Sequence, residues 1–229
     1  MVGFSFGAFA SVKNTPVVHQ WDGHGEVHGA GDAVVTTNGT AVTKWLPNTT
    51  GSGIWFNPTP TGYLQLGPPR GLHAPILTLQ DPTPTPLGNC VFVVVRMNVP
   101  SPVSELTTIL HLCNENIQFN WNGASQNGYY YYNTTGASMV SPTCSIGQIF
   151  VVGMQIKSMQ TNIVWDPSNT NNVQTVTHPQ SLTQSTGVWV MGHSSTIDYT
   201  LFEVAVYGDM PLSHFCSVYR ALRAKWNAP

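Results

Sequence analysis

The chain has 229 residues, of which 41% are hydrophobic and only 8% are charged, whereas about 25% of residues are charged in an ordinary globular protein. Eight Lys and Arg against ten Asp and Glu give a formal net charge of −2, which argues against an electrostatic nucleic-acid binder, because phosphate neutralisation needs clustered basic side chains. The polar residues are instead mostly neutral, with 25 Thr, 21 Gly, 17 Asn, 17 Ser and 17 Pro. This composition excludes a disordered chain without a core and is typical of an exposed, turn-rich β-structure.

The N-terminus and the cysteines both bear on where the chain folds. The apolar stretch from Met1 to Val12 is short, broken by glycine and not preceded by a basic residue, so neither a secretory signal nor a membrane span is expected. We interpret residues 1–19 as an N-terminal arm that packs against a neighbouring subunit, and residues 20–229 as one domain. The cysteines lack metal-finger spacing, and free thiols are predicted for Cys90, Cys113, Cys144 and Cys216.

A polar segment, WDGHGEVHGAGD, follows the arm. Asp22, His24, Glu26 and His28 recur with a period of two, which would place all four on one side of an extended segment. Two imidazoles and two carboxylates can ligate a divalent metal, most naturally Zn²⁺. The interleaved glycines favour a polar loop or an intersubunit contact instead, and a catalytic site is the third interpretation. We expect no cofactor other than this metal.

Apolar runs of strand length alternate with Gly, Pro and Asn clusters along the rest of the chain, as in an antiparallel sandwich. The run from Cys90 to Met97 is β-branched and nearly continuous, which predicts a central strand covered on both faces. Further strands are predicted at 107–112, 117–121, 149–156, 162–165, 173–176 and 188–191, with a meander as the topology of the last four. In the strand 199–207, alternation predicts that Phe202, Val204 and Val206 share one face, from which Glu203 points away.

The segment FNWNGASQNGYYYYN predicts a hairpin that concentrates aromatic rings and amides. Rings offer apolar contact area with a polar tip, and amides offer directed hydrogen bonds, a mixture that suits both sugars and partner proteins. Plain sheet packing and a protein contact remain alternatives to glycan binding. The candidate ligand-binding residues are Trp121, Asn122, Tyr129, Tyr130, Tyr131 and Tyr132.

After Pro211, apolar residues recur at spacings of three and four, which predicts an amphipathic helix at 211–227 that docks on the sandwich. Ser213 is the predicted N-cap, and three basic residues lie in the last turns, where cations meet the negative end of a helix. The apolar stripe consists of Leu212, Phe215, Val218, Tyr219, Leu222 and Trp226, and the basic residues are Arg220, Arg223 and Lys225.

The C-terminal sequences VWVMGH, DYTLFEVAVYGDMPLSHF and YRALRAKWN resemble the closing block of concanavalin A-like, laminin-G-type jelly-roll domains. The stretch DAVVTTNGTAVTKW and the order of the segments after it are similar to the start of such domains in bacterial and phage proteins. The resemblance spans residues 20 to 227 and rests on pattern and order. It implies an all-β, two-sheet antiparallel jelly-roll sandwich with a C-terminal α-helix. Lectins, glycosidases and structural modules share this fold, so the fold does not settle the function.

An enzyme is not expected, because the alternating carboxylates that retaining glucanases of this fold carry are missing, as are phosphate-loop and dinucleotide motifs. We favour a structural virion protein, a capsid surface, decoration or fibre-type subunit, assembled in a host cytoplasm. Its partners would be other virion subunits, in a homo-oligomer, with a host cell-surface glycan as a further ligand. The alternative is a non-viral carbohydrate-binding module or adhesin outside the cell or at its surface, and a glycoside hydrolase ranks third. Neither nucleic-acid binding nor membrane insertion is expected.

Overall fold

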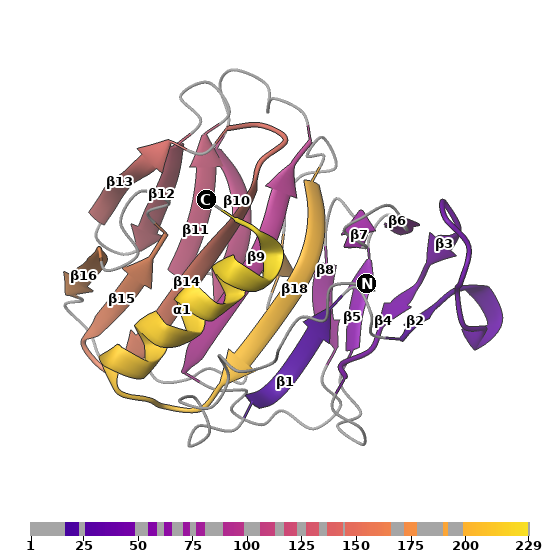
Figure 1. The fold of residues 1–229 in the computed structure, drawn as a ribbon, viewed down its shortest axis with the longest axis horizontal. Coiled ribbons are helices and arrows are strands. Elements are labelled where there is room, and N and C mark those ends of the chain that lie inside the picture. Colours follow the sequence, from indigo (N-terminus) through magenta and orange to yellow (C-terminus); the bar gives the residue numbers. More distant parts are fainter. Residues whose placement is uncertain are drawn as a thin grey trace, which may run out of the picture.

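The computed structural model describes residues 17–22, 26–48, 55–58, 62–65, 71–73, 77–80, 89–98, 106–112, 117–122, 127–132, 137–143, 145–165, 172–177, 190–191 and 199–228. These residues form two antiparallel sheets of nine strands each, a short 3-10 helix, η2 (Ala30–Asp32), and one C-terminal helix, α1 (Leu212–Trp226) (Figure 1). The predicted all-β sandwich with a terminal helix is therefore confirmed. No helix in this part of the chain has the length and apolar character that a membrane span requires.

The first sheet has the strand order β16-β15-β14-β9-β18-β7-β6-β3, and β1 also pairs with β18. The strand β9 lies between β14 and β18, and every residue of β9 except Arg96 is buried. This confirms the predicted central strand. The strands of this sheet are β1 (Val17–Asp22), β3 (Ala41–Val42), β6 (Gly62–Gln65), β7 (Gly71–His73), β9 (Cys90–Met97), β14 (Ile149–Lys157), β15 (Gln160–Val164), β16 (Val173–Thr177) and β18 (Tyr199–Tyr207).

The second sheet has the order β13-β12-β11-β10-β17-β8-β5-β4-β2. The predicted meander is confirmed for β14, β15 and β16, but it is wrong for its fourth strand, because β17 crosses to the second sheet and pairs with β10 and β8. The strands of this sheet are β2 (Val27–His28), β4 (Lys44–Trp45), β5 (Trp55–Pro58), β8 (Leu77–Gln80), β10 (Leu106–Leu112), β11 (Ile117–Asn122), β12 (Asn127–Tyr132), β13 (Ala137–Thr143) and β17 (Val190–Met191).

An aromatic cluster joins the two sheets. The ring of Trp165, just after β15, lies 4.8 Å from Phe119 of β11 and 4.7 Å from Phe150 of β14, measured between ring centroids. All three side chains are buried in one core with valines of β9, β14 and β18. Since burial of a Phe side chain contributes about 1.5–3 kcal/mol, this contact between the layers is a substantial part of what holds the sandwich closed.

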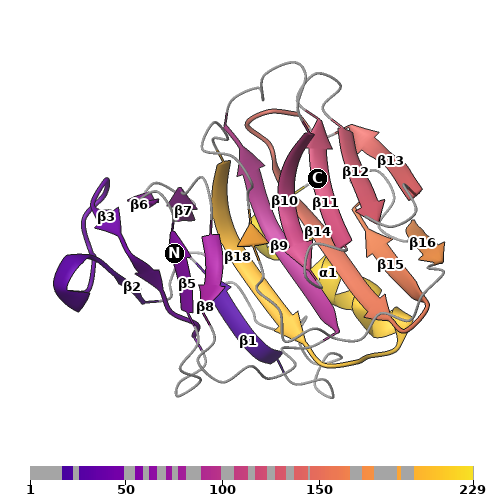
Figure 2. The same ribbon diagram turned by 180° about the vertical axis from the view of Figure 1, so that it is seen from behind.

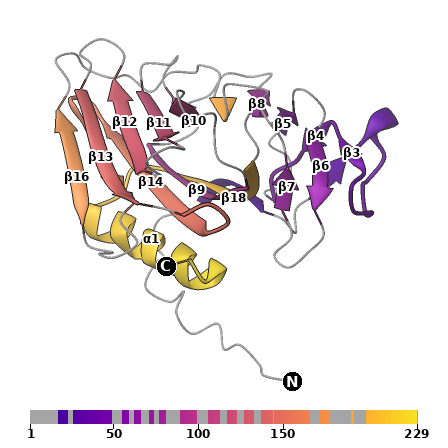
Figure 3. The ribbon, with the colours of Figure 1, turned by 90° about the horizontal axis from the view of Figure 1, so that it is seen from above.

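The helix α1 covers the outer face of the first sheet, as Figure 3 shows from above. Phe215 is fully buried, with its ring 4.9 Å from that of Phe92 on β9. The predicted apolar stripe is confirmed except at Leu212, which is 43% exposed. The prediction of Ser213 as N-cap is wrong: Pro211 is the cap residue, in an extended conformation and without a side-chain cap bond, because proline fits the helix start while offering no side-chain acceptor.

A β-bulge in β18 overturns the predicted distribution of its side chains between the two faces. Pairing with β9 shifts register between Leu201 and Glu203, and such a bulge breaks strict alternation. Phe202 consequently packs on the α1 side, its ring 5.4 Å from that of Trp226. Val204 and Val206 lie in the core between the sheets instead. Glu203 does not point away from Phe202, since its carboxylate also bonds Trp226.

Two predictions are only partly covered by the described residues. The strand β1 begins at Val17, so the last residues of the predicted arm 1–19 belong to the first sheet, while residues 1–16 lie outside the described ranges. Cys90 and Cys216 are buried free thiols, as predicted. Burial raises the pKa of the Cys90 thiol to about 11, against a weaker opposing hydrogen bond from Gln155, so this cysteine is an inert core residue. Cys113 and Cys144 lie outside the described ranges.

Candidate functional site

The tyrosine-rich segment forms the predicted hairpin, β11 and β12, near one end of the second sheet (Figure 2). The two strands pair without irregularity from Ile117 opposite Tyr132 to Asn122 opposite Asn127. Phe119 fixes the orientation of the hairpin, because this side chain is buried and touches Trp165 of the core. The face that includes position 119 is therefore the face turned toward the first sheet.

The pairing divides the candidate ligand-binding residues between the two faces of the sheet. Residues two apart in a strand share a face, and so do residues directly opposite each other. Trp121 and Tyr132 therefore belong to the face of Phe119, as does Tyr130, its cross-strand partner. The opposite face receives Asn122, Tyr129 and Tyr131. The structure thus brings the six candidates together on neighbouring strands but assigns only three of them to the outer face.

The outer face extends across several strands as a polar row. Successive pairings connect residue 131 on β12 with residues 118, 111, 190, 78 and 57, and with residue 138 on β13. A second row connects residue 129 with residues 120 and 108. We call these positions the polar face: Asn57, Thr78, Thr108, His111, Gln118, Asn120, Asn122, Tyr129, Tyr131 and Ser138, with the apolar residues Leu106, Val140 and Val190 among them.

Two properties of the polar face suit ligand binding. Its residues are amides, hydroxyls, two tyrosines, one histidine and three apolar residues, without a carboxylate, lysine or arginine. The second property is that no described helix covers this face. In the described part of the chain, α1 is the only element longer than a single turn outside the two sheets, and it lies on the first sheet (Figure 3). Amides and hydroxyls give directed hydrogen bonds, while aromatic rings give apolar contact.

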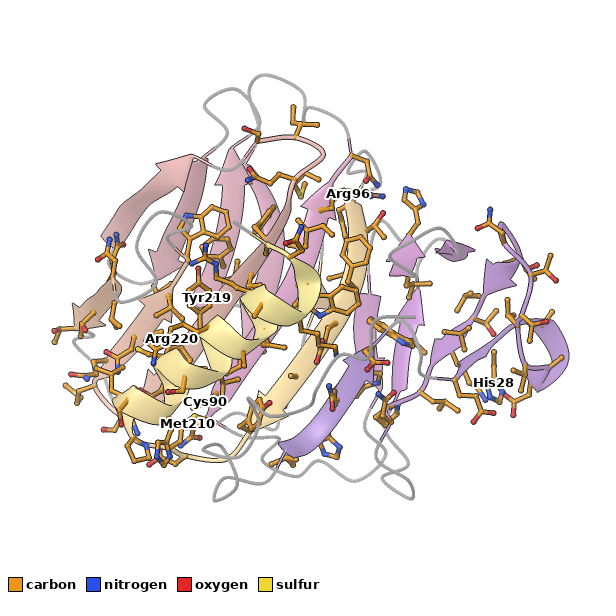
Figure 4. The ribbon with its side chains drawn as sticks, in the orientation of Figure 1. His28, Cys90, Arg96, Met210, Tyr219 and Arg220 are labelled. Carbon is orange, nitrogen blue, oxygen red and sulfur yellow. The ribbon has the colours of Figure 1, made fainter. Side chains whose placement is uncertain are left out.

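The predicted metal-ligating residues occupy different settings. Asp22 ends β1, and its carboxylate lies 3.6 Å from Lys225 Nζ of α1. His28 lies on β2, toward the far end of the molecule (Figure 4), with Nε2 2.8 Å from Glu26 Oε1. His24 lies outside the described ranges. Within those ranges, no group of three His, Cys, Asp or Glu side chains is placed to hold a metal ion, so the metal site stays a prediction.

The surroundings of His28 form a small ionic network. Its Nδ1 lies 3.1 Å from Asp32 Oδ1, and Lys44 Nζ donates to the same oxygen at 2.7 Å. Partial desolvation of His28 opposes protonation, but hydrogen bonds to Glu26 and Asp32 outweigh it and raise the pKa of His28. The hydrogen bond from Lys44 lowers the pKa of Asp32. The network therefore favours a charged histidine between two carboxylates.

Strand pairing creates a carboxylate pair that sequence reasoning missed. Asp22 of β1 lies directly opposite Glu203 of β18, and both residues are buried. Glu203 accepts hydrogen bonds from Lys225 Nζ at 2.7 Å, from Trp226 Nε1 at 2.6 Å and from Gln20 Nε2 at 2.5 Å. The signal available in the sequence was a single Glu in an apolar strand that is followed by a helix with basic residues. Asp22 is too distant in sequence to be recognised as the neighbour of this Glu.

This pair holds the fold together rather than forming an open catalytic site. Paired carboxylates are the arrangement that glycoside hydrolysis uses. Here, however, Glu203 is only 1% exposed, and its oxygens already accept three hydrogen bonds. The cluster fastens the C-terminal turn of α1 to β1 and β18.

Comparison with known proteins reveals similarity in structure only. No protein-family model and no curated protein sequence matches the chain. Trypanosoma rangeli sialidase in complex with 2,3-difluorosialic acid has a similar structure at 10% identity, with a TM-score of 0.53, over 90% of this chain and 33% of that chain. A botulinum neurotoxin type C protein described as interacting with two ganglioside molecules is similar at 8% identity, TM-score 0.54, over 92% and 52%. A mutant of HCR D/C VPI 5995 is similar at 8% identity, with a TM-score of 0.55, over 92% of this chain and 53% of that chain.

The similarity extends to the fold and no further. This chain spans about a third to a half of the length of these solved structures, and at identities of 8–10% the likeness shows the fold alone. The shared feature is the antiparallel β-sandwich, which agrees with the predicted fold class. Membership of the concanavalin A-like family stays a prediction.

Proposed function

We propose that this chain is a non-catalytic glycan-binding protein that forms part of a virion surface. The observation that carries the proposal is the polar face of the second sheet, where tyrosines, amides and hydroxyls without formal charge line up across neighbouring strands. Neutral sugars present hydroxyls and apolar C–H faces, which such residues match. A compact protein partner would more often meet an apolar centre with Arg and Met.

The similar structures support a glycan ligand. One of them holds a sialic acid derivative, and another is described as interacting with gangliosides. Both descriptions concern proteins that share the sandwich with this chain. We infer that a surface carbohydrate, including sialylated forms, is the ligand class to test first.

The surroundings of the described carboxylates support a non-catalytic role. Asp22 and Glu203 are buried and pair with the partly exposed Lys225. The remaining described carboxylates pair on the surface: Glu26 with His28, Asp32 with Lys44, and Asp209 with Lys157. Glycosidases that work through a pair of Asp or Glu residues need both carboxyl groups facing a substrate cleft, and each of these carboxylates has a structural partner instead.

The virion role rests on composition. A chain with 8% charged residues and a surface of Thr, Asn, Gly and Pro fits a subunit that is mostly covered by neighbours in a particle, assembled in a host cytoplasm. Within that proposal the arm 1–19 contacts a neighbouring subunit. Deletion of residues 1–12 is expected to abolish particle assembly while leaving glycan binding by the free subunit intact. A non-viral adhesin would use the same polar face but would form no particle.

The glycan proposal is tested by one substitution on the polar face and one control substitution away from it. Binding of the full chain to an array of neutral and sialylated glycans is compared for the wild type, Tyr131→Ala and Thr36→Ala. Tyr131 lies on the polar face, whereas Thr36 is exposed at the far end of the molecule. Loss of an aromatic contact is expected to weaken binding about tenfold. Absence of binding by the wild type, or equal binding by Tyr131→Ala, would reject the proposal.

A further inference from the structure

The two sheets end in strands that differ in how well their outer edges are protected. An unpaired edge presents backbone N–H and C=O groups to other chains, and proteins blunt it with short length, bulges, charges or proline. The terminal strands β2 and β3 have only two residues each. The terminal strand β13 contains Pro142, and its pairing with β12 is irregular. The strand β1, which pairs only with β18 among the described residues, also shifts register.

The fifth edge, β16, has none of these protections within its own residues, and among the described strands it pairs only with β15. Its sequence VQTVT contains no charge, proline or glycine. It pairs with β15 over five consecutive residues without a bulge. Val176 is buried in the core between the sheets, whereas Thr175 and Thr177 are exposed. Figure 1 shows β16 at the rim of the first sheet, beyond β15.

A buried row of hydrogen bonds leads directly to this edge. Gln155 Nε2 donates to the Met210 carbonyl at 2.6 Å, and Asn162 Nδ2 donates to Gln155 Oε1 at 2.9 Å. Thr175 Oγ1 in turn donates to Asn162 Oδ1 at 2.8 Å. Gln155, Asn162 and Thr175 are direct cross-strand partners on β14, β15 and β16. This row of hydrogen bonds fixes the cross-strand register at Thr175, and its last member is the Thr175 hydroxyl at the edge of the sheet.

We propose that β16 pairs in antiparallel orientation with β16 of a second copy of this chain, so that the two first sheets become continuous. A two-fold axis perpendicular to the sheet keeps each face on its own side, so a residue meets one from the same face. The register that pairs all five residues places Thr175 opposite Thr175 of the second copy. It also places Val173 opposite Thr177, and Gln174 opposite Val176. No like charges meet, and the β-branched side chains suit cross-strand packing.

The size of the ladder sets the strength of the dimer. Five residues extend about 17 Å, and main-chain pairing over that length gives a small interface that forms reversibly. Isolated subunits therefore dimerise in a concentration-dependent way, and many such contacts in one particle reinforce each other. This inference goes beyond glycan recognition, because β16 belongs to the first sheet and the polar face to the second.

Charge substitutions at the two-fold axis test the proposal. Sedimentation equilibrium of the full chain is measured over a wide range of concentrations for the wild type, Thr175→Lys and Thr175→Glu. Wild type is expected to dimerise, and each variant alone to be monomeric, because identical charges meet across the axis. An equal mixture of the two variants is expected to regain the dimer, since Lys then lies opposite Glu. Thr36→Lys, which adds the same charge at an exposed position outside β16, should dimerise like the wild type.

A measurement on the unmodified chain guards against variants that fail to fold. Amide hydrogen exchange at residues 173–177 should slow as the wild-type concentration rises. A wild type that stays monomeric, exchange that does not depend on concentration, or variants that dimerise normally would each overturn the proposal. Glycan binding by folded Thr175→Lys is expected to equal that of the wild type, so failure of the dimer and failure of the proposed ligand are distinguishable.

Discussion

At the scale of single residues, Lys225 balances two carboxylates that strand pairing brings together. Its Nζ lies 2.7 Å from Glu203 and 3.6 Å from Asp22. Because both acidic residues are buried, neither has water to solvate its charge once the ammonium is removed. The single lysine in the last turn of α1 is therefore a stability determinant, and the helix dipole explains only part of its value.

Replacement of this lysine by an apolar side chain of similar length should destabilise the fold. Breaking a buried ion pair costs about 3–5 kcal/mol, and partial exposure of Lys225 reduces the expected loss for Lys225→Met to about 2–3 kcal/mol. Urea unfolding provides the measurement. The matched control is Lys44→Met, which removes a cation from the exposed Asp32 and should change the free energy of unfolding much less. Equal losses in the two variants would contradict the interpretation of Lys225.

The network around His28 predicts a dependence on pH. Since the pKa of His28 is raised in the folded chain, its stabilising contribution is fully present below about pH 6.5, the ordinary pKa of histidine. It is lost as the pH rises through the raised pKa. Titration of His28 followed by NMR should give a midpoint above the ordinary value, and Asp32→Asn should lower that midpoint. Asp209→Asn, which removes a carboxylate paired with Lys157, should leave it unchanged; a similar decrease there would refute the local origin of the shift.

At the scale of elements, sequence patterns predicted what depends on neighbours along the chain. The apolar run of β9 and the three-and-four spacing of α1 each identify one element, because a single periodicity determines which residues are buried. The bulge in β18 and the crossing of β17 to the second sheet could not be predicted in this way. Both depend on partners that are far away in sequence, such as Val94 opposite Glu203 and Thr78 opposite Val190.

The candidate site shows the same boundary between local and distant information. The hairpin was predicted from its aromatic and amide residues. Its two faces could be distinguished only through Phe119, because this side chain contacts Trp165, which directly follows β15 of the first sheet. The pairing of Asp22 with Glu203 likewise required the first sheet to be assembled. Thus composition predicted a candidate site, and topology determined which of its residues share a face of the sheet.

The docking of α1 predicts a strong effect from one contact. Phe215 is fully buried against Phe92, so Phe215→Ala is expected to lower the free energy of unfolding by about 3–5 kcal/mol through lost burial and a cavity. Leu212→Ala on the same helix serves as the control, because Leu212 is 43% exposed and surface substitutions change stability by less than about 0.5 kcal/mol. Both are measured by urea unfolding. A loss below about 1 kcal/mol for Phe215→Ala would show that α1 is not needed to cover the sheet.

At the scale of the whole molecule, the proposed dimer contact and the proposed ligand surface belong to different sheets. The outer face of the first sheet is covered by α1, and the row of hydrogen bonds through Gln155, Asn162 and Thr175 leads across this sheet to the β16 edge. The polar face belongs to the second sheet. A subunit built in this way can join a second copy through one sheet while its proposed ligand surface on the other sheet stays accessible.

The position of β18 has a consequence for how the protein is made. This strand lies inside the first sheet and pairs with β9, β7 and β1, although it follows all of them by a long stretch of chain. Until synthesis has passed Tyr207, the backbone groups of β1, β7 and β9 that pair with β18 remain without that partner. Late closure of distant pairs makes folding slow and leaves partial chains prone to stick to one another. Partial chains that stop before β18 are therefore expected to depend on chaperones.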